Sequence, residues 1–152
     1  MRAVSQERAR PEGGLVPSGT PIGVVLVEDN DVFRETLELL LDVTPDLQVV
    51  ASVPDGRSAL DVCQRVDPDV VVMDYRLPEL DGVEVTGAIR RACPEAAVVV
   101  LTGGADPGEL AALREAGAVA CLTKDQDLEA IAGAIREAAA SRAPARGVVP
   151  GE

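Results

Sequence analysis

The sequence contains no histidine and no tryptophan, and it has only one phenylalanine and one tyrosine among 152 residues. Base-stacking platforms need aromatic side chains, and contacts to phosphate backbones need a surplus of basic ones. The formal net charge is −12, so the surface repels nucleic-acid phosphates. We therefore expect no direct DNA or RNA contact by this segment.

Cysteine is also scarce. Cys63, Cys93 and Cys121 are odd in number and far apart, and none belongs to a CxxC pair. This pattern favours neither a disulfide framework nor a zinc site, and suits buried free thiols. The sequence also lacks an apolar run of about 18 residues and an apolar core near its N-terminus, so we expect no membrane span, no export signal and a cytoplasmic location.

Aliphatic residues supply most of the hydrophobic content, which reaches 47% of the sequence and is rich in valine. Such a composition suits strands that are buried on both faces of a sheet. Residues 1–20 instead carry Gly, Pro, Ser and Arg without periodicity, and residues 142–152 carry Gly, Pro and Arg. We interpret them as a disordered leader and a linker or disordered tail, and residues 21–141 as one domain.

Apolar runs and helical patterns alternate through this domain. The runs are Ile22–Val27, Leu47–Val53, 70–73, Ala96–Thr102 and Ala118–Thr123, each followed by a helical pattern. The expected inward residues are Phe33, Leu37, Leu40 and Leu41 in the first helix, Ala59, Leu60 and Cys63 in the second, and Leu128, Ile131 and Ile135 in the last. The expected helix ends are an Asp55 cap, capping boxes at Asp81/Glu84 and Asp106/Glu109, Pro107 at a first helical position and Gly117 at a stop.

Five strand–helix units predict an α/β domain with a doubly wound, five-stranded parallel sheet and right-handed crossovers. A flavodoxin-like arrangement is the economical solution. Its ligands bind at the carboxyl ends of the strands, near the point where the strand order reverses.

Polar side chains gather at those predicted strand ends: Glu28, Asp29, Asp74, Thr102 and Lys124. Each has a simpler interpretation, because acids at strand ends often cap helices and threonine is a good strand former. Lys124 is the only lysine in the chain, although chance could place it there. Together, however, three acids would repel one another and raise the pKa of at least one, and Mg²⁺ would relieve that repulsion.

A hydroxyl and an ammonium opposite the metal would stabilise phosphoryl oxygens. Without histidine, Asp74 is the plausible nucleophile, and it would form an acyl phosphate.

At these residues the sequence resembles the response-regulator receiver domains of two-component signalling, which have the CheY-like fold with strand order 2-1-3-4-5. The likeness covers about residues 22–140. Its most specific part is "VVVMDYRLPELDGVE", and "LVEDN", "LTGG" and "LTK" occur in the expected order.

The resemblance implies a role for each matching residue. Asp74 would accept a phosphoryl group from a histidine kinase, and Thr102 and Lys124 would contact that group. Asp29, Asp74 and the backbone carbonyl of Arg76 would ligate Mg²⁺, with Glu28 acting through water. Pro78 and Gly82 would shape the following loop, and Gly103 would leave room for the phosphoryl group.

Two positions depart from the family pattern. Cys121 stands where an aromatic residue usually couples to the threonine, and Asp125 replaces a frequent proline. The expected site is intact, whereas the usual aromatic–hydroxyl coupling cannot operate in its ordinary form.

We therefore expect a phosphoacceptor switch that is not itself an enzyme. It would act through an output domain or downstream protein, with a possible homodimer on phosphorylation, either alone or as the receiver of a helix-turn-helix transcription regulator. The alternatives are a pseudo-receiver that is never phosphorylated and serves as an interaction module, and a metal-dependent phosphatase or phosphotransferase. The second is disfavoured because Arg76, rather than an acid, lies two residues beyond Asp74.

Overall fold

The computed structural model describes residues 20–141, in which five strands alternate with five helices. The strands are β1 (Ile22–Val27), β2 (Leu47–Val53), β3 (Val70–Asp74), β4 (Ala97–Thr102) and β5 (Ala118–Thr123). The helices are α1 (Asp31–Asp42), α2 (Gly56–Val66), α3 (Gly82–Ala92), α4 (Pro107–Ala116) and α5 (Leu128–Ser141).

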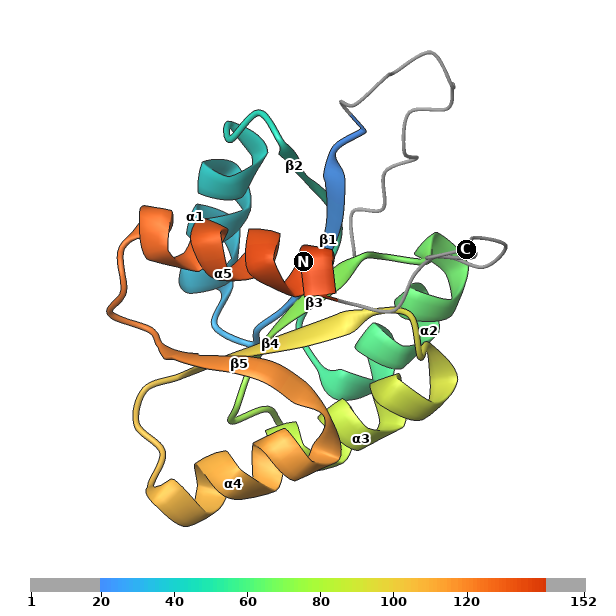
Figure 1. The fold of residues 1–152 in the computed structure, drawn as a ribbon, viewed down its shortest axis with the longest axis vertical. Helices are drawn as coiled ribbons and strands as arrows, with labels where there is room; N and C mark the ends of the chain where they lie inside the picture. Colours follow the sequence, from blue (N-terminus) through green and yellow to red (C-terminus); the bar gives the residue numbers. More distant parts are fainter. Residues whose placement is uncertain (1–19, 142–152) are drawn as a thin grey trace.

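The strands form one parallel sheet in the order β2-β1-β3-β4-β5, so the predicted flavodoxin-like, CheY-like fold is confirmed. Helices α1 and α5 cover one face, and α2, α3 and α4 cover the other (Figure 1). The strand order reverses between β1 and β3. Because the strands are parallel, the residues that follow Val27 and Met73 emerge side by side at this switch point.

The sheet separates two apolar clusters. One packs beneath α2, α3 and α4 and includes Ala59, Val85 and Leu113; the other packs beneath α1 and α5 and includes Leu41 and Ile135. Strands β3 and β4 are buried throughout and β1 is buried apart from its first residue, as their valine-rich sequences predict. Strand β5 lies at an edge of the sheet and is only partly covered.

The first helix deviates in part from its prediction. Leu37 and Leu41 are buried and Phe33 packs against the same cluster, but Leu40 is 41% exposed. Leu40 lies about 100° around the helix from Leu41, which turns it off the face that meets the sheet. The prediction that Leu40 belongs to the inward stripe was wrong.

The predicted helix ends are confirmed. Asp55 caps α2, and capping boxes join Asp81 to Glu84 and Asp106 to Glu109. Pro107 begins α4, and Gly117 ends it with a φ of 120°, a backbone region that favours glycine. The cap of α1 is Asn30, whose side chain accepts from the Phe33 N–H at 2.8 Å.

None of the helices between residues 20 and 141 combines the length and the apolar character that crossing a membrane would require. Residues 1–19 and 142–152 lie outside the described residues. The interpretation of the first segment as a disordered leader and of the second as a linker or tail therefore stays a prediction.

Candidate functional site

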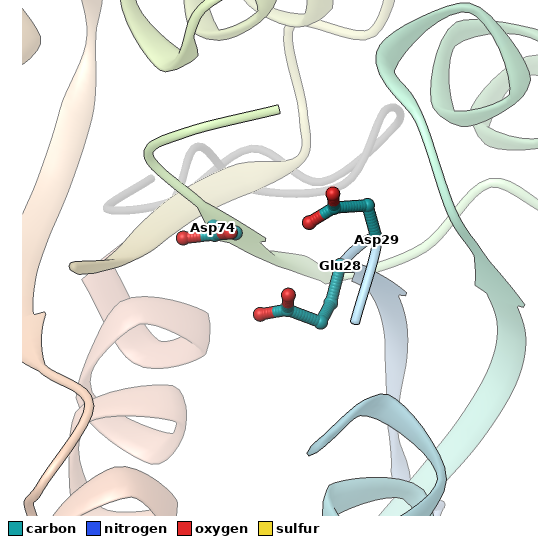
Figure 2. A group of neighbouring side chains, drawn as sticks. All are labelled: Glu28, Asp29 and Asp74. Atoms are coloured by element: carbon teal, nitrogen blue, oxygen red, sulfur yellow. The ribbon is translucent and has the colours of Figure 1, made fainter. Parts of the chain in front are cut away.

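Three carboxylates meet at the switch point. Glu28 and Asp29 follow β1 and Asp74 ends β3, and one carboxylate oxygen from each lies within 4.8 Å of the others. Figure 2 shows Glu28 and Asp29 leaving the end of one strand beside Asp74 on its neighbour. Glu28 and Asp74 are only 4% and 6% exposed, whereas Asp29 faces solvent.

The single lysine neutralises part of this charge. Lys124 follows β5, and its Nζ lies 2.8 Å from Glu28 Oε1 and 3.4 Å from Asp74 Oδ2. The backbone N–H of Lys124 donates to the Thr102 carbonyl at 2.8 Å, which ties the lysine to the end of β4. The prediction that the ends of β1, β3 and β5 bring these groups together is confirmed.

The pKa values of two groups in the cluster are shifted. Burial raises the pKa of Glu28, and the nearby Asp74 raises it further. Lys124 and the Asn30 N–H, which donates to Glu28 Oε2 at 2.9 Å, act in the opposite direction and lower that pKa, but burial prevails. Burial by itself lowers the pKa of Lys124, but the contacts with Glu28 and Asp74 outweigh it and raise that pKa. Lys124 therefore stays an ammonium at neutral pH, while Glu28 resists ionisation. Glu28 is therefore the acid of the cluster in which the predicted rise in pKa occurs.

Thr102 is placed close to the site but is engaged locally. It ends β4, is 3% exposed, and its Oγ1 accepts from the Gly104 N–H at 3.0 Å. The neighbouring residue of β4, Leu101, pairs with Asp74, and its carbonyl accepts from the Tyr75 N–H at 2.9 Å. A Cβ built on Gly103 would meet no atom within 4 Å, so the space beside Thr102 is open.

The loop after Asp74 folds back over its own start. The N–H of Arg76 lies 3.4 Å from Asp74 Oδ1, and the Gly82 N–H donates to the Tyr75 carbonyl at 2.8 Å. A Cβ on Gly82 would lie 3.0 Å from the Tyr75 backbone, so this close approach favours glycine. The Arg76 guanidinium lies over the Tyr75 ring, 5.2 Å from its centroid.

Two residues of α1 that sequence reasoning did not place in the site contact it. The Phe33 ring centroid lies 4.8 Å from Lys124 Nζ, and Arg34 Nη1 donates to the Glu28 backbone carbonyl at 2.7 Å. Phe33 had been assigned only to the core face of its helix. Its uniqueness in the sequence was the one available signal, and by itself it pointed to no partner.

The donor set suits a hard divalent cation. It consists of carboxylate oxygens, two of them buried beside one ammonium, and it includes neither a thiolate nor an imidazole. Mg²⁺ prefers such oxygen ligands and keeps several waters, which the exposed side of Asp29 would allow. The residues present therefore fit the predicted metal.

The parallel sheet and the acidic cluster at its switch point define a CheY-like receiver domain. The sequence model of the response regulator receiver domain matches residues 24–136, and the chain belongs to this family.

Similar proteins of known sequence include response regulators and a protein-glutamate methylesterase. The nitrate/nitrite response regulator NarP of Escherichia coli K12 is 36% identical over 124 residues, which cover 82% of this chain and 58% of NarP. A protein-glutamate methylesterase/protein-glutamine glutaminase of Nitrosospira multiformis is 39% identical over 106 residues, covering 68% of this chain and 30% of that protein. The chain spans about half the length, or less, of such relatives.

Solved receiver domains share the fold over almost their whole length. The NarL receiver domain of Mycobacterium tuberculosis superposes with a TM-score of 0.76 at 30% identity, covering 80% of this chain and 98% of that one. The receiver domain of Thermotoga maritima CheB gives 0.74 at 27% identity, covering 81% and 99%. The family thus includes receivers of transcription regulators and receivers attached to enzymes, while the receiver domain itself is not the catalytic part.

Proposed function

We propose that this domain is a phosphoacceptor switch in which Asp74 takes a phosphoryl group from a histidine kinase in the presence of Mg²⁺. The observation that carries the proposal is the convergence of Glu28, Asp29, Asp74 and Lys124 at one sheet edge. A binding module without phosphoryl chemistry would have no need for a partly buried cluster of like charges, which opposes folding.

In the proposed reaction an Asp74 carboxylate oxygen attacks the phosphorus of the donor. The new O–P bond forms as the P–N bond to the kinase histidine breaks, and the departing nitrogen keeps the electron pair. Lys124 pairs with the phosphoryl oxygens, and the Thr102 hydroxyl leaves Gly104 to bond one of them. Bound Mg²⁺, held by Asp29, Asp74, the Arg76 carbonyl and, through water, Glu28, would offset the accumulating negative charge.

The test is phosphorylation with acetyl phosphate and Mg²⁺, read by intact mass. We expect one phosphoryl group on the unmodified protein, none on Asp74→Asn and none in EDTA. Asp106→Asn is the matched control, because asparagine caps a helix as well as aspartate does and α4 should stay intact. Label that persists on Asp74→Asn would move the acceptor to another residue.

Two other results would replace the proposal. If Mg²⁺ has no effect on thermal unfolding and no label forms, the domain is a pseudo-receiver that works through binding alone. Continuous turnover of a phosphomonoester would make it a hydrolase.

We further propose that the switched contacts involve an output domain or downstream protein, as in a helix-turn-helix transcription regulator. Transcriptional regulatory proteins among the relatives support this: DegU of Brevibacillus brevis is 31% identical over 76% of this chain. A homodimer on phosphorylation is part of the proposal. Sedimentation that does not change with beryllofluoride, a phosphoryl mimic, would argue against the dimer.

A further inference from the structure

Lys124 is held by a third group besides its two acids. The face of the Phe33 ring lies 4.8 Å from Nζ, from a helix that begins directly after the acidic cluster. Phe33 is the third residue of α1, and the Asn30 cap fixes its backbone through a 2.8 Å hydrogen bond. The chain's only phenylalanine and only lysine therefore form a cation–π pair at the edge of the site.

The ring differs from the acids because it has no other task in the site. Asp74 is the proposed nucleophile, and Glu28 is proposed to hold Mg²⁺ through water. Phosphoryl transfer would therefore engage both of the acids that bind the ammonium, Glu28 at 2.8 Å and Asp74 at 3.4 Å. A neutral ring competes with neither. Its attraction for a cation depends on the quadrupole of the ring and persists while the carboxylates are occupied.

We propose that Phe33 is the positioning residue for Lys124: its ring keeps the ammonium over the site while Glu28 and Asp74 are engaged, ready to pair with a phosphoryl oxygen. The catalytic part of this inference rests on the proposed function, whereas the ring–ammonium contact does not. The competing role for Phe33 is core packing alone, since it also lies against the apolar cluster under α1 and α5.

Fluorination separates the two roles, because fluorine on the ring weakens its quadrupole and hardly alters its shape. Phe33 is the only phenylalanine in this chain, so biosynthetic incorporation of 4-fluoro-, 3,5-difluoro- and 3,4,5-trifluorophenylalanine modifies that ring alone. Lysine labelled with ¹⁵N likewise reports only Lys124. The Phe33→Leu protein grown with the same analogues takes up none of them and is the matched control.

We expect the Lys124 Nζ signal of the metal-free protein to shift stepwise with each added fluorine. The rate of phosphorylation by acetyl phosphate at saturating Mg²⁺ should fall in the same order, by about two- to fivefold in total, the range of an exposed cation–π pair. Phe33→Leu should match the slowest member. The midpoint of thermal unfolding of the fluorinated proteins should stay within a few degrees, as packing is preserved.

A Lys124 signal and a phosphorylation rate that ignore fluorination would leave Phe33 a packing residue and overturn the proposal. If the unfluorinated protein takes no phosphoryl group, the proposed function fails and the catalytic part of the inference fails with it. A protein that is phosphorylated at a rate insensitive to the ring overturns the role of Phe33 alone.

Discussion

Asp29 offers a direct test of the repulsion within the acidic cluster. It is the exposed member of the three carboxylates, so Asp29→Asn removes one charge without emptying a buried position. We expect the variant to be more stable than the unmodified protein without metal and less stable with Mg²⁺. Such a reversal follows only if the same carboxylate both repels its neighbours and binds the cation.

The size of the effect follows from the spacing of the carboxylate oxygens, which lie within 4.8 Å of one another. Two unit charges at that distance in a water-like dielectric repel by about 0.9 kcal/mol. Asp29 has two such neighbours, and the Lys124 ammonium, which pairs with both of them at 2.8 and 3.4 Å, offsets part of their repulsion. The variant should therefore gain about 1 kcal/mol in free energy of unfolding, or about 4 °C in the thermal midpoint for a domain of this size.

Thermal unfolding in EDTA and in a MgCl₂ titration provides the assay. Mg²⁺ at ten times its dissociation constant should stabilise the unmodified protein by about 1.4 kcal/mol, a gain that Asp29→Asn should largely lose. Glu137→Gln, an exposed acid on α5, is the control for net charge and should show neither effect. A lower midpoint for Asp29→Asn in EDTA, or an undiminished response to Mg²⁺, would refute the reasoning.

Three further outcomes can be measured. Burial raises the pKa of Glu28 above its ordinary 4.5, so the free energy of unfolding of the metal-free protein should fall as pH rises from 4.5 through the pKa of the folded state. Glu28→Gln should flatten that part of the plot of unfolding free energy, measured in urea, against pH. Parallel plots for the two proteins would contradict this. Burial also raises the pKa of Cys63 to about 12, so in a protein whose other two cysteines are serine, Ellman's reagent at pH 8 should react only on unfolding, and rapid reaction of the folded protein would disprove this. Ile135→Ala should lower the free energy of unfolding, measured in urea, by about 2–5 kcal/mol, because Ile135 is 0% exposed between α5 and the sheet. A loss below about 1 kcal/mol would contradict this and would mean that the core closes around the smaller side chain.

Local signals in the sequence predicted most of the fold. The limits of α4 follow from Asp106, Pro107, Glu109 and Gly117, whose chemistry acts within a single helical turn of each helix end. The prediction for Leu40 failed because its burial depends on how far the surface of β2 and α5 extends around α1. That extent is a tertiary property, and helical periodicity does not contain it.

Part of the candidate site could likewise be predicted from the sequence, and part of it could not. Its carboxylates and lysine could be predicted because parallel strands deliver their ends to one edge of the sheet. The contact between Phe33 and Lys124 could not, because it depends on how α1 is placed relative to the residues that follow β5, and the two residues are far apart in the chain. The bond between Thr102 and Gly104 belongs to a loop whose conformation the residue types leave open.

The parallel sheet also sets the distance between the acidic cluster and the opposite edge of the domain. Arg136 in the later part of α5 binds Asp46 just before β2, at 2.7 Å, so α5 runs from the site toward the amino ends of the strands, where β1 also starts. Asp74 lies at the opposite ends, roughly 15–20 Å away for strands of five to seven residues. The amino-end edge of the sheet therefore makes no direct contact with the acidic cluster. A change at Asp74 can therefore affect that edge only through movements of helices or strands.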